Sequence, residues 1–157
     1  LIIPTAVFML GHSGKYKAAW IYKIFPMKDY TYLKKGSLKA FLIKLYIPLY
    51  VVLSVVFCLI YGIRIIPDLL AVLVASCLYT VICYISYGSK IPFTKPYDEI
   101  GDAHGWIALV LFIPIAIIAG IHYFMATQIA YGVLIYLAVL VIVNFVVWKV
   151  VFRRSIQ

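Results

Sequence analysis

The stretch LYIPLYVVLSVVFCLIYGI, residues 45 to 63, decides the fold, because it contains no charged side chain. Lys44 precedes it and Arg64 follows it. As a helix it has the length needed to cross a hydrocarbon core of about 30 Å. The run is continuously apolar, without the alternation of a membrane-barrel strand. A helix also satisfies its own backbone groups inside lipid. We therefore expect a transmembrane helix here.

Three more runs of the same kind follow, over residues 69–89, 105–125 and 130–148. The whole chain of 157 residues is 66% hydrophobic and 12% charged, whereas soluble domains are roughly half apolar and a quarter charged. This composition excludes a water-soluble enzyme, a nucleic-acid-binding domain and a disordered protein. The sequence predicts an all-α, polytopic helical membrane protein with four full transmembrane helices.

The chain divides into three predicted parts. Residues 1–10 are apolar but span only about half of a bilayer core, so we expect the end of a truncated transmembrane helix. Residues 11–43 mix lysines with aromatic side chains and predict a cytoplasmic, interfacial segment. Residues 44–157 form the predicted four-helix transmembrane domain.

The basic residues predict the orientation. Thirteen of the 14 Lys and Arg residues fall before the first full span, between the second and third, and after the fourth. Arg64 alone lies on the other side. Such asymmetry places the basic side in the cytoplasm, and with it the C-terminus. The formal net charge of +9 then indicates contact with anionic lipid, with no nucleic-acid partner expected.

Two cytoplasmic stretches are candidate docking surfaces for a partner. Residues 15–39 interleave lysines with Trp20, Tyr22 and other aromatic side chains. They fit either an interfacial helix with snorkelling lysines or a docking surface. We expect Pro26 to end a short helix begun near Lys15, and Ser37 to cap the helix that becomes the first full span.

The second stretch, residues 90–104, is the only sizeable cytoplasmic connection between full spans. Its docking candidates are Tyr97, Asp98 and Glu99. The alternative is a solvated loop in which Asp102 caps the third span.

The chain offers no recognisable catalytic chemistry. Residues 11–15, GHSGK, lack the spacing of a phosphate loop and predict a helix exit. Cys58, Cys77 and Cys83 lie in apolar runs, without metal-site spacing. His122, near the outer end of the third span, is expected at the interface. The four spans contain no Asp, Glu, Lys or Arg. We expect no enzyme activity, cofactor or metal.

Five residues are candidates for helix packing. Ala71 with Ala75, and Ala116 with Gly120, have the spacing of small residues that lets helices approach closely. Asn144 is the one strongly polar side chain deep in a span, so we expect it to hydrogen-bond a neighbouring helix.

Several of these features together resemble a known family. The segments KAAWIYK (17–23) and KGSLKA (35–40), with Pro26 and Pro48, look like a stretch in the C-terminal half of bacterial ABC-type exporter permeases. The resemblance implies a permease fragment in the bacterial inner membrane. It also implies a separate ATP-binding subunit and a dimer of membrane subunits. The alternative is a non-transporting membrane scaffold or assembly protein.

Overall fold

The computed structural model describes residues 2–24, 30–88, 91–97 and 103–153. These residues form helices and their connections, with no strand among them. Four helical stretches are long and apolar enough to cross a membrane: Thr31–Tyr61, Ile63–Ser86, Gly105–Gln128 and Gly132–Arg153. The prediction of an all-α, multi-pass membrane protein is confirmed.

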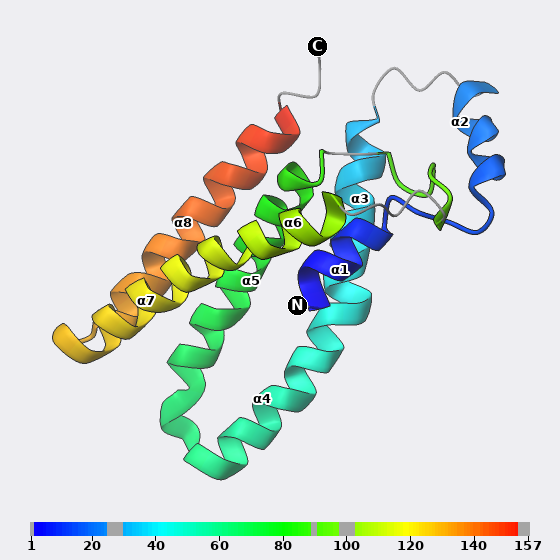
Figure 1. Ribbon diagram of the computed structural model, residues 1–157. Helices are drawn as coiled ribbons and strands as arrows, with labels where there is room; N and C mark the ends of the chain where they lie inside the picture. The colour runs from blue at the N-terminus through cyan, green and yellow to red at the C-terminus, as the bar shows by residue number, and fades with distance from the viewer. Residues whose placement is uncertain (1, 25–29, 89–90, 98–102, 154–157) are drawn as a thin grey trace.

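The N-terminal part is made of short helices (Figure 1). Helix α1 (Ile2–Met9) ends in a turn, in which the Gly11 amide donates to the Phe8 carbonyl. A 3₁₀ helix, η1 (Tyr16–Trp20), then runs directly into α2 (Ile21–Ile24). A short helix after Lys15 is therefore present, while Pro26, its predicted end, lies outside the described residues.

The first full span belongs to one long helix built from α3 (Thr31–Phe41), a π-helical turn η2 (Leu42–Tyr46) and α4 (Ile47–Tyr61). The prediction that Ser37 caps this helix is wrong. The helix begins at Thr31, and the Ser37 hydroxyl, in its interior, donates 3.0 Å to the Leu33 carbonyl. The lysines of α3 are compatible with a helix, so the charges alone did not mark where the helix begins.

Helix α5 (Ile66–Ser86), preceded by the 3₁₀ turn η3 (Ile63–Ile65), occupies the centre of the bundle. Nine of its residues are buried, more than in any other described helix. Near its C-terminal end Cys83, Tyr84 and the following Tyr87 pack in one cluster with Val7 and Phe8 of α1. In its N-terminal half it packs in a second cluster with α8 (Gly132–Arg153).

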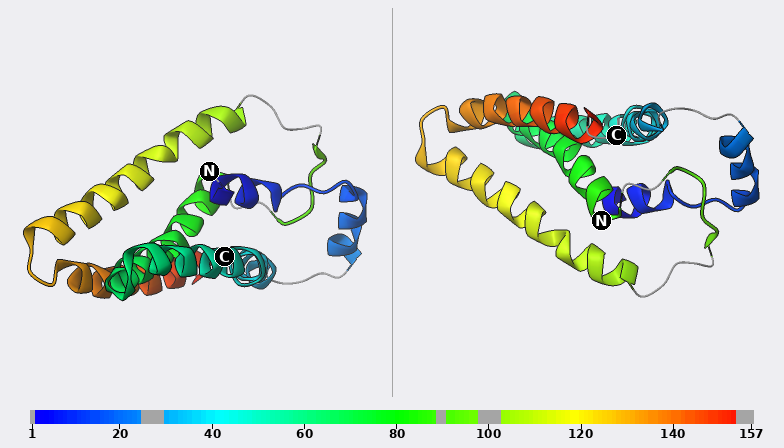
Figure 2. Two further views of the ribbon diagram at one scale, coloured as in Figure 1. Left: turned by 90° about the horizontal axis from the view of Figure 1, so that it is seen from below. Right: turned by 90° about the horizontal axis from the view of Figure 1, so that it is seen from above.

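The third span is broken in two. Helix α6 (Ala103–Val110) stops one residue before α7 (Phe112–Gln128). Pro114 explains the break, because its nitrogen cannot donate to the Val110 carbonyl one turn earlier. Figure 2 shows that α7 meets α8 at their shared turn and that the two helices diverge from there towards α6.

Candidate docking site and intramembrane cavity

The two predicted docking stretches meet at one groove. This aromatic groove has a volume of about 490 Å³ and is lined by residues from η1, α2 and the segments beside them: Tyr16, Lys17, Ala19, Trp20, Tyr22, Tyr30, Ile91 and Thr94. The first six come from residues 15–39, the first docking stretch, and the last two from the loop after α5, the second stretch. The groove is therefore built from segments about 70 residues apart in the sequence.

Backbone hydrogen bonds join these two segments. The Phe93 amide donates to the Leu10 carbonyl at 2.9 Å, and the Ser13 amide donates to the Lys95 carbonyl at 2.9 Å. The amides of Thr94 and Lys95 both donate to the Gly11 carbonyl at 3.1 Å. This pairing ties the loop to the exit of α1 and so fixes one wall of the groove against the other.

A buried histidine, His12, lies within the paired segment after α1. His12 is 3% exposed, and its Nδ1 lies 3.0 Å from the Phe8 carbonyl, one turn earlier. Its ring is 4.4 Å from the Phe8 ring and 6.4 Å from the Tyr97 ring, and the Phe8 ring is 5.3 Å from that of Tyr87. The rings form a continuous row from the loop to the end of α5.

The predicted docking residues can now be placed. Trp20 is 58% exposed and lines the aromatic groove together with Tyr22, whose carbonyl accepts a hydrogen bond of 2.9 Å from the Tyr30 hydroxyl. Tyr97 lies beside the groove, half exposed and stacked on His12. Asp98, Glu99 and the predicted cap Asp102 lie outside the described residues.

A second site lies within the spans. A cavity of about 210 Å³ lies between α5, α7 and α8. Its lining is mainly apolar and includes Ala71, Ala75, Ile118 and Ala119; its polar members are Ser76, Tyr79, His122 and Tyr136. Its size fits a small apolar group or a segment of an acyl chain rather than a large polar solute.

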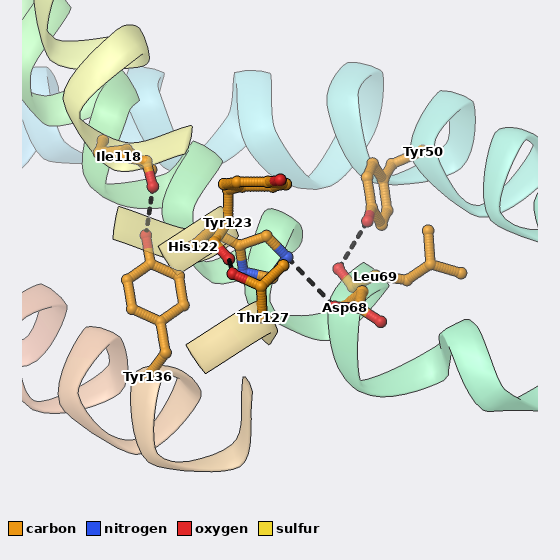
Figure 3. A network of polar contacts seen from close by, with 8 residues as sticks. All are labelled: Tyr50, Asp68, Leu69, Ile118, His122, Tyr123, Thr127 and Tyr136. Carbon is orange, nitrogen blue, oxygen red and sulfur yellow. Dashed lines mark hydrogen bonds and ion pairs between the residues drawn. The ribbon is translucent and has the colours of Figure 1, made fainter. Parts of the chain in front are cut away.

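Polar contacts near this cavity link the helices (Figure 3). His122 Nε2 lies 3.1 Å from Asp68 Oδ1 and so joins α7 to the start of α5. The Tyr136 hydroxyl donates 3.0 Å to the Ile118 carbonyl and joins α8 to α7. The Tyr50 hydroxyl donates 2.6 Å to the Leu69 carbonyl and joins α4 to α5. Each contact holds one pair of apolar helices: the first joins two polar side chains, and the other two join a tyrosine hydroxyl to a backbone carbonyl.

The candidate packing residues fall into two groups. Ala71 and Ala75 are buried in the cluster with Tyr136 and Leu140 of α8. Asn144 Nδ2 donates 2.8 Å to the Val74 carbonyl of α5.

Ala116 and Gly120, by contrast, are exposed on α7. Apart from the neighbouring backbone of α7 itself, no atom lies within 4 Å of the position that a Cβ on Gly120 would take. Within the described chain this pair forms no close helix contact.

Sequence reasoning missed the Asp68–His122 contact and the cavity. Asp68 begins the second span, and His122 lies near the end of the third. Asp68 lies in the same connection as Arg64, on the predicted outer side, and His122 was predicted at the outer interface. That shared depth was the available signal. Among the described residues, no group of three or more His, Cys, Asp or Glu side chains is placed to hold a metal.

Comparison with known proteins gave no match: no family model, no curated protein and no solved structure is significantly similar to the chain.

Proposed function

We propose that this chain is part of the membrane-spanning permease of an ATP-driven, ABC-type exporter in the bacterial inner membrane. A separate ATP-binding subunit would dock on the aromatic groove, and two membrane subunits would act together. One observation carries the proposal: the two stretches singled out as docking candidates line the same groove. The groove offers the exposed Trp20 beside three half-buried tyrosines, and aromatic side chains are enriched at protein interfaces.

The row of rings from Tyr97 to Tyr87 would transmit a movement at the docking site to the membrane-spanning helix α5. A partner pressing on Tyr97 acts on His12 and Phe8, and through them on Tyr87 at the end of α5. Helix α5 in turn lines the intramembrane cavity. A change at the groove can thus alter the cavity through contacts that are already packed.

Irregular turns in two of the spans add a means of movement. The π turn Leu42–Tyr46 and the interruption at Leu111 both lie beside prolines, Pro48 and Pro114. π turns are frequent at functional sites, and prolines weaken the hydrogen-bond ladder locally. These two positions are where the spans would bend.

The proposal requires the aromatic groove and the C-terminus to face the cytoplasm. On a background with Cys58, Cys77 and Cys83 replaced by Ala, a cysteine at Ser86 should be labelled from the cytoplasmic side only. A cysteine at Ile63, the other end of the same span, should be labelled from outside only. Labelling of both positions from one side would contradict this topology.

Docking is tested by purification from native membranes in mild detergent. The expected result is co-purification of an ATPase with the unaltered protein and its loss in the Trp20→Ala/Tyr22→Ala variant. The matched control is Tyr32→Ala/Trp106→Ala, which removes the same two side-chain types from exposed positions outside the groove. The control should retain the ATPase.

Recovery of the protein without any ATPase, together with unchanged export after its deletion, would contradict the proposal. That result would favour the alternative, a non-transporting membrane scaffold or assembly protein.

A further inference from the structure

A further hollow in the molecule is separate from both the intramembrane cavity and the aromatic groove. This basic groove, of about 590 Å³, lies between α3, α5 and α8. Lys35 and Lys39 of α3 and Lys149 of α8 line it, so three positive charges from two helices converge on one hollow. None of the described residues that line it is acidic.

Packing holds the charged part of the basic groove in shape. Lys35 Nζ lies 5.9 Å from the centre of the Phe152 ring, within the range of a cation–π contact. The Phe152 ring is 5.2 Å from the ring of Trp148, which itself lines the groove. Lys35 is therefore drawn towards α8, beside Lys149.

The remainder of the basic groove is apolar. Val74 and Cys77 of α5 and Val141 and Phe145 of α8 line it. Asn144, the remaining polar member, already donates its amide to the Val74 carbonyl. From Lys149 to Val141 the helix rises about 12 Å, close to the depth of one leaflet, which is about 15 Å.

We propose that the basic groove is a binding site for an anionic phospholipid. Its phosphate lies among Lys35, Lys39 and Lys149, and one acyl chain lies along the apolar part. The charge favours an anionic headgroup, since a zwitterionic one brings an ammonium group to the same lysines.

The apolar part lies between two helices that are apolar enough to span a membrane. This placement favours a lipid over a soluble acidic partner. The inference is independent of the exporter proposal, because it involves neither the aromatic groove nor ATP.

Trp148 provides a reporter inside the site. In the Trp20→Phe/Trp106→Phe protein, Trp148 is the only tryptophan. This protein is reconstituted in phosphatidylcholine vesicles containing an equal mole fraction of either brominated phosphatidylglycerol or brominated phosphatidylcholine. We expect the brominated phosphatidylglycerol to quench Trp148 more strongly, because the site concentrates the anionic lipid.

Substitution of the lysines tests the cause. Lys35→Gln, Lys39→Gln and Lys149→Gln should each lower the preference for the anionic lipid by about fivefold. The control variants each remove one positive charge outside the basic groove: Lys15→Gln, Lys17→Gln and Lys44→Gln. They should keep most of the preference for the anionic lipid. A protein that keeps only Trp106, an exposed tryptophan on α6, should show little preference.

Equal quenching of Trp148 by the two brominated lipids would overturn the inference. So would an undiminished preference in the triple variant lacking Lys35, Lys39 and Lys149. Circular dichroism of each variant checks that the helices are intact before the comparison is made.

Discussion

Helices α5 and α7 have similar apolar composition but very different surroundings. Nine residues of α5 are buried, whereas α7 has none. Both contain small residues one turn apart, Ala71 with Ala75 and Ala116 with Gly120. In α5 these lie in one buried cluster with Tyr136 and Leu140 of α8. A pair of small residues therefore makes a helix contact only where a partner helix supplies matching large side chains.

Helix α7 is instead held by a few local contacts. They include the Tyr136 hydrogen bond to Ile118, the contact between His122 and Asp68, the Tyr79 hydrogen bond to the Leu111 carbonyl at the start of α7, and the tight turn into α8 at Gly132. Because of this difference, substitutions in α5 should act through packing, and those near α7 through these attachments.

The largest effect is expected at the turn between α7 and α8. A Cβ on Gly132 would overlap the backbone carbonyl of Met125, which cannot move without disturbing the end of α7. Gly132→Ala should lower the free energy of unfolding by about 3 kcal/mol, measured by unfolding in mixed detergent and SDS micelles. Gly120→Ala is the control and should cause no loss, because apart from the neighbouring backbone of α7 itself no atom lies within 4 Å of its added Cβ.

Packing along α5 is tested next. Leu78 is buried in the cluster with α8, so Leu78→Ala should cost about 2 kcal/mol of unfolding free energy through lost packing. Ile117→Ala removes as many carbon atoms from an exposed side chain of α7 and should be nearly neutral. Equal losses in the two variants would mean that α7 packs as closely as α5.

The hydrogen bond from Tyr136 gives a smaller effect. Tyr136→Phe removes the hydroxyl that reaches the Ile118 carbonyl and should cost about 1 kcal/mol of unfolding free energy. Tyr123→Phe removes a hydroxyl from an exposed side chain of α7 and should cost little. A neutral Tyr136→Phe would show that this contact does not hold α7 to α8.

The smallest effect concerns the contact between Asp68 and His122. Their side chains are 38% and 22% exposed, so solvent screens the attraction. Asp68→Asn should cost about 0.5 kcal/mol of unfolding free energy, and the difference from the unaltered protein should shrink as salt is added. A loss that does not change with salt would indicate a packing role for Asp68.

The sequence was sufficient for the fold class because long charge-free runs must be helical in lipid. It also indicated Asn144 as a polar side chain that would need a partner on another helix. It could not indicate that Trp20 and Ile91 line the same groove, because that depends on backbone pairing between distant segments. Nor could it separate Ala71 from Ala116, because the spacing is identical and only the facing helix differs.

The π turn at Leu42–Tyr46 has a consequence for the phase of the first span. The Ile47 amide donates to the Leu42 carbonyl five residues earlier rather than four, so the turn holds one residue more than an α-helical turn. Each residue of an α-helix advances by about 100°. Phe41, just before this turn, and Leu42, its first residue, are buried, and no residue of α4 is buried after it. Deleting one residue here would therefore rotate α4 about its own axis relative to α3. The Tyr50 hydroxyl would then point away from the Leu69 carbonyl.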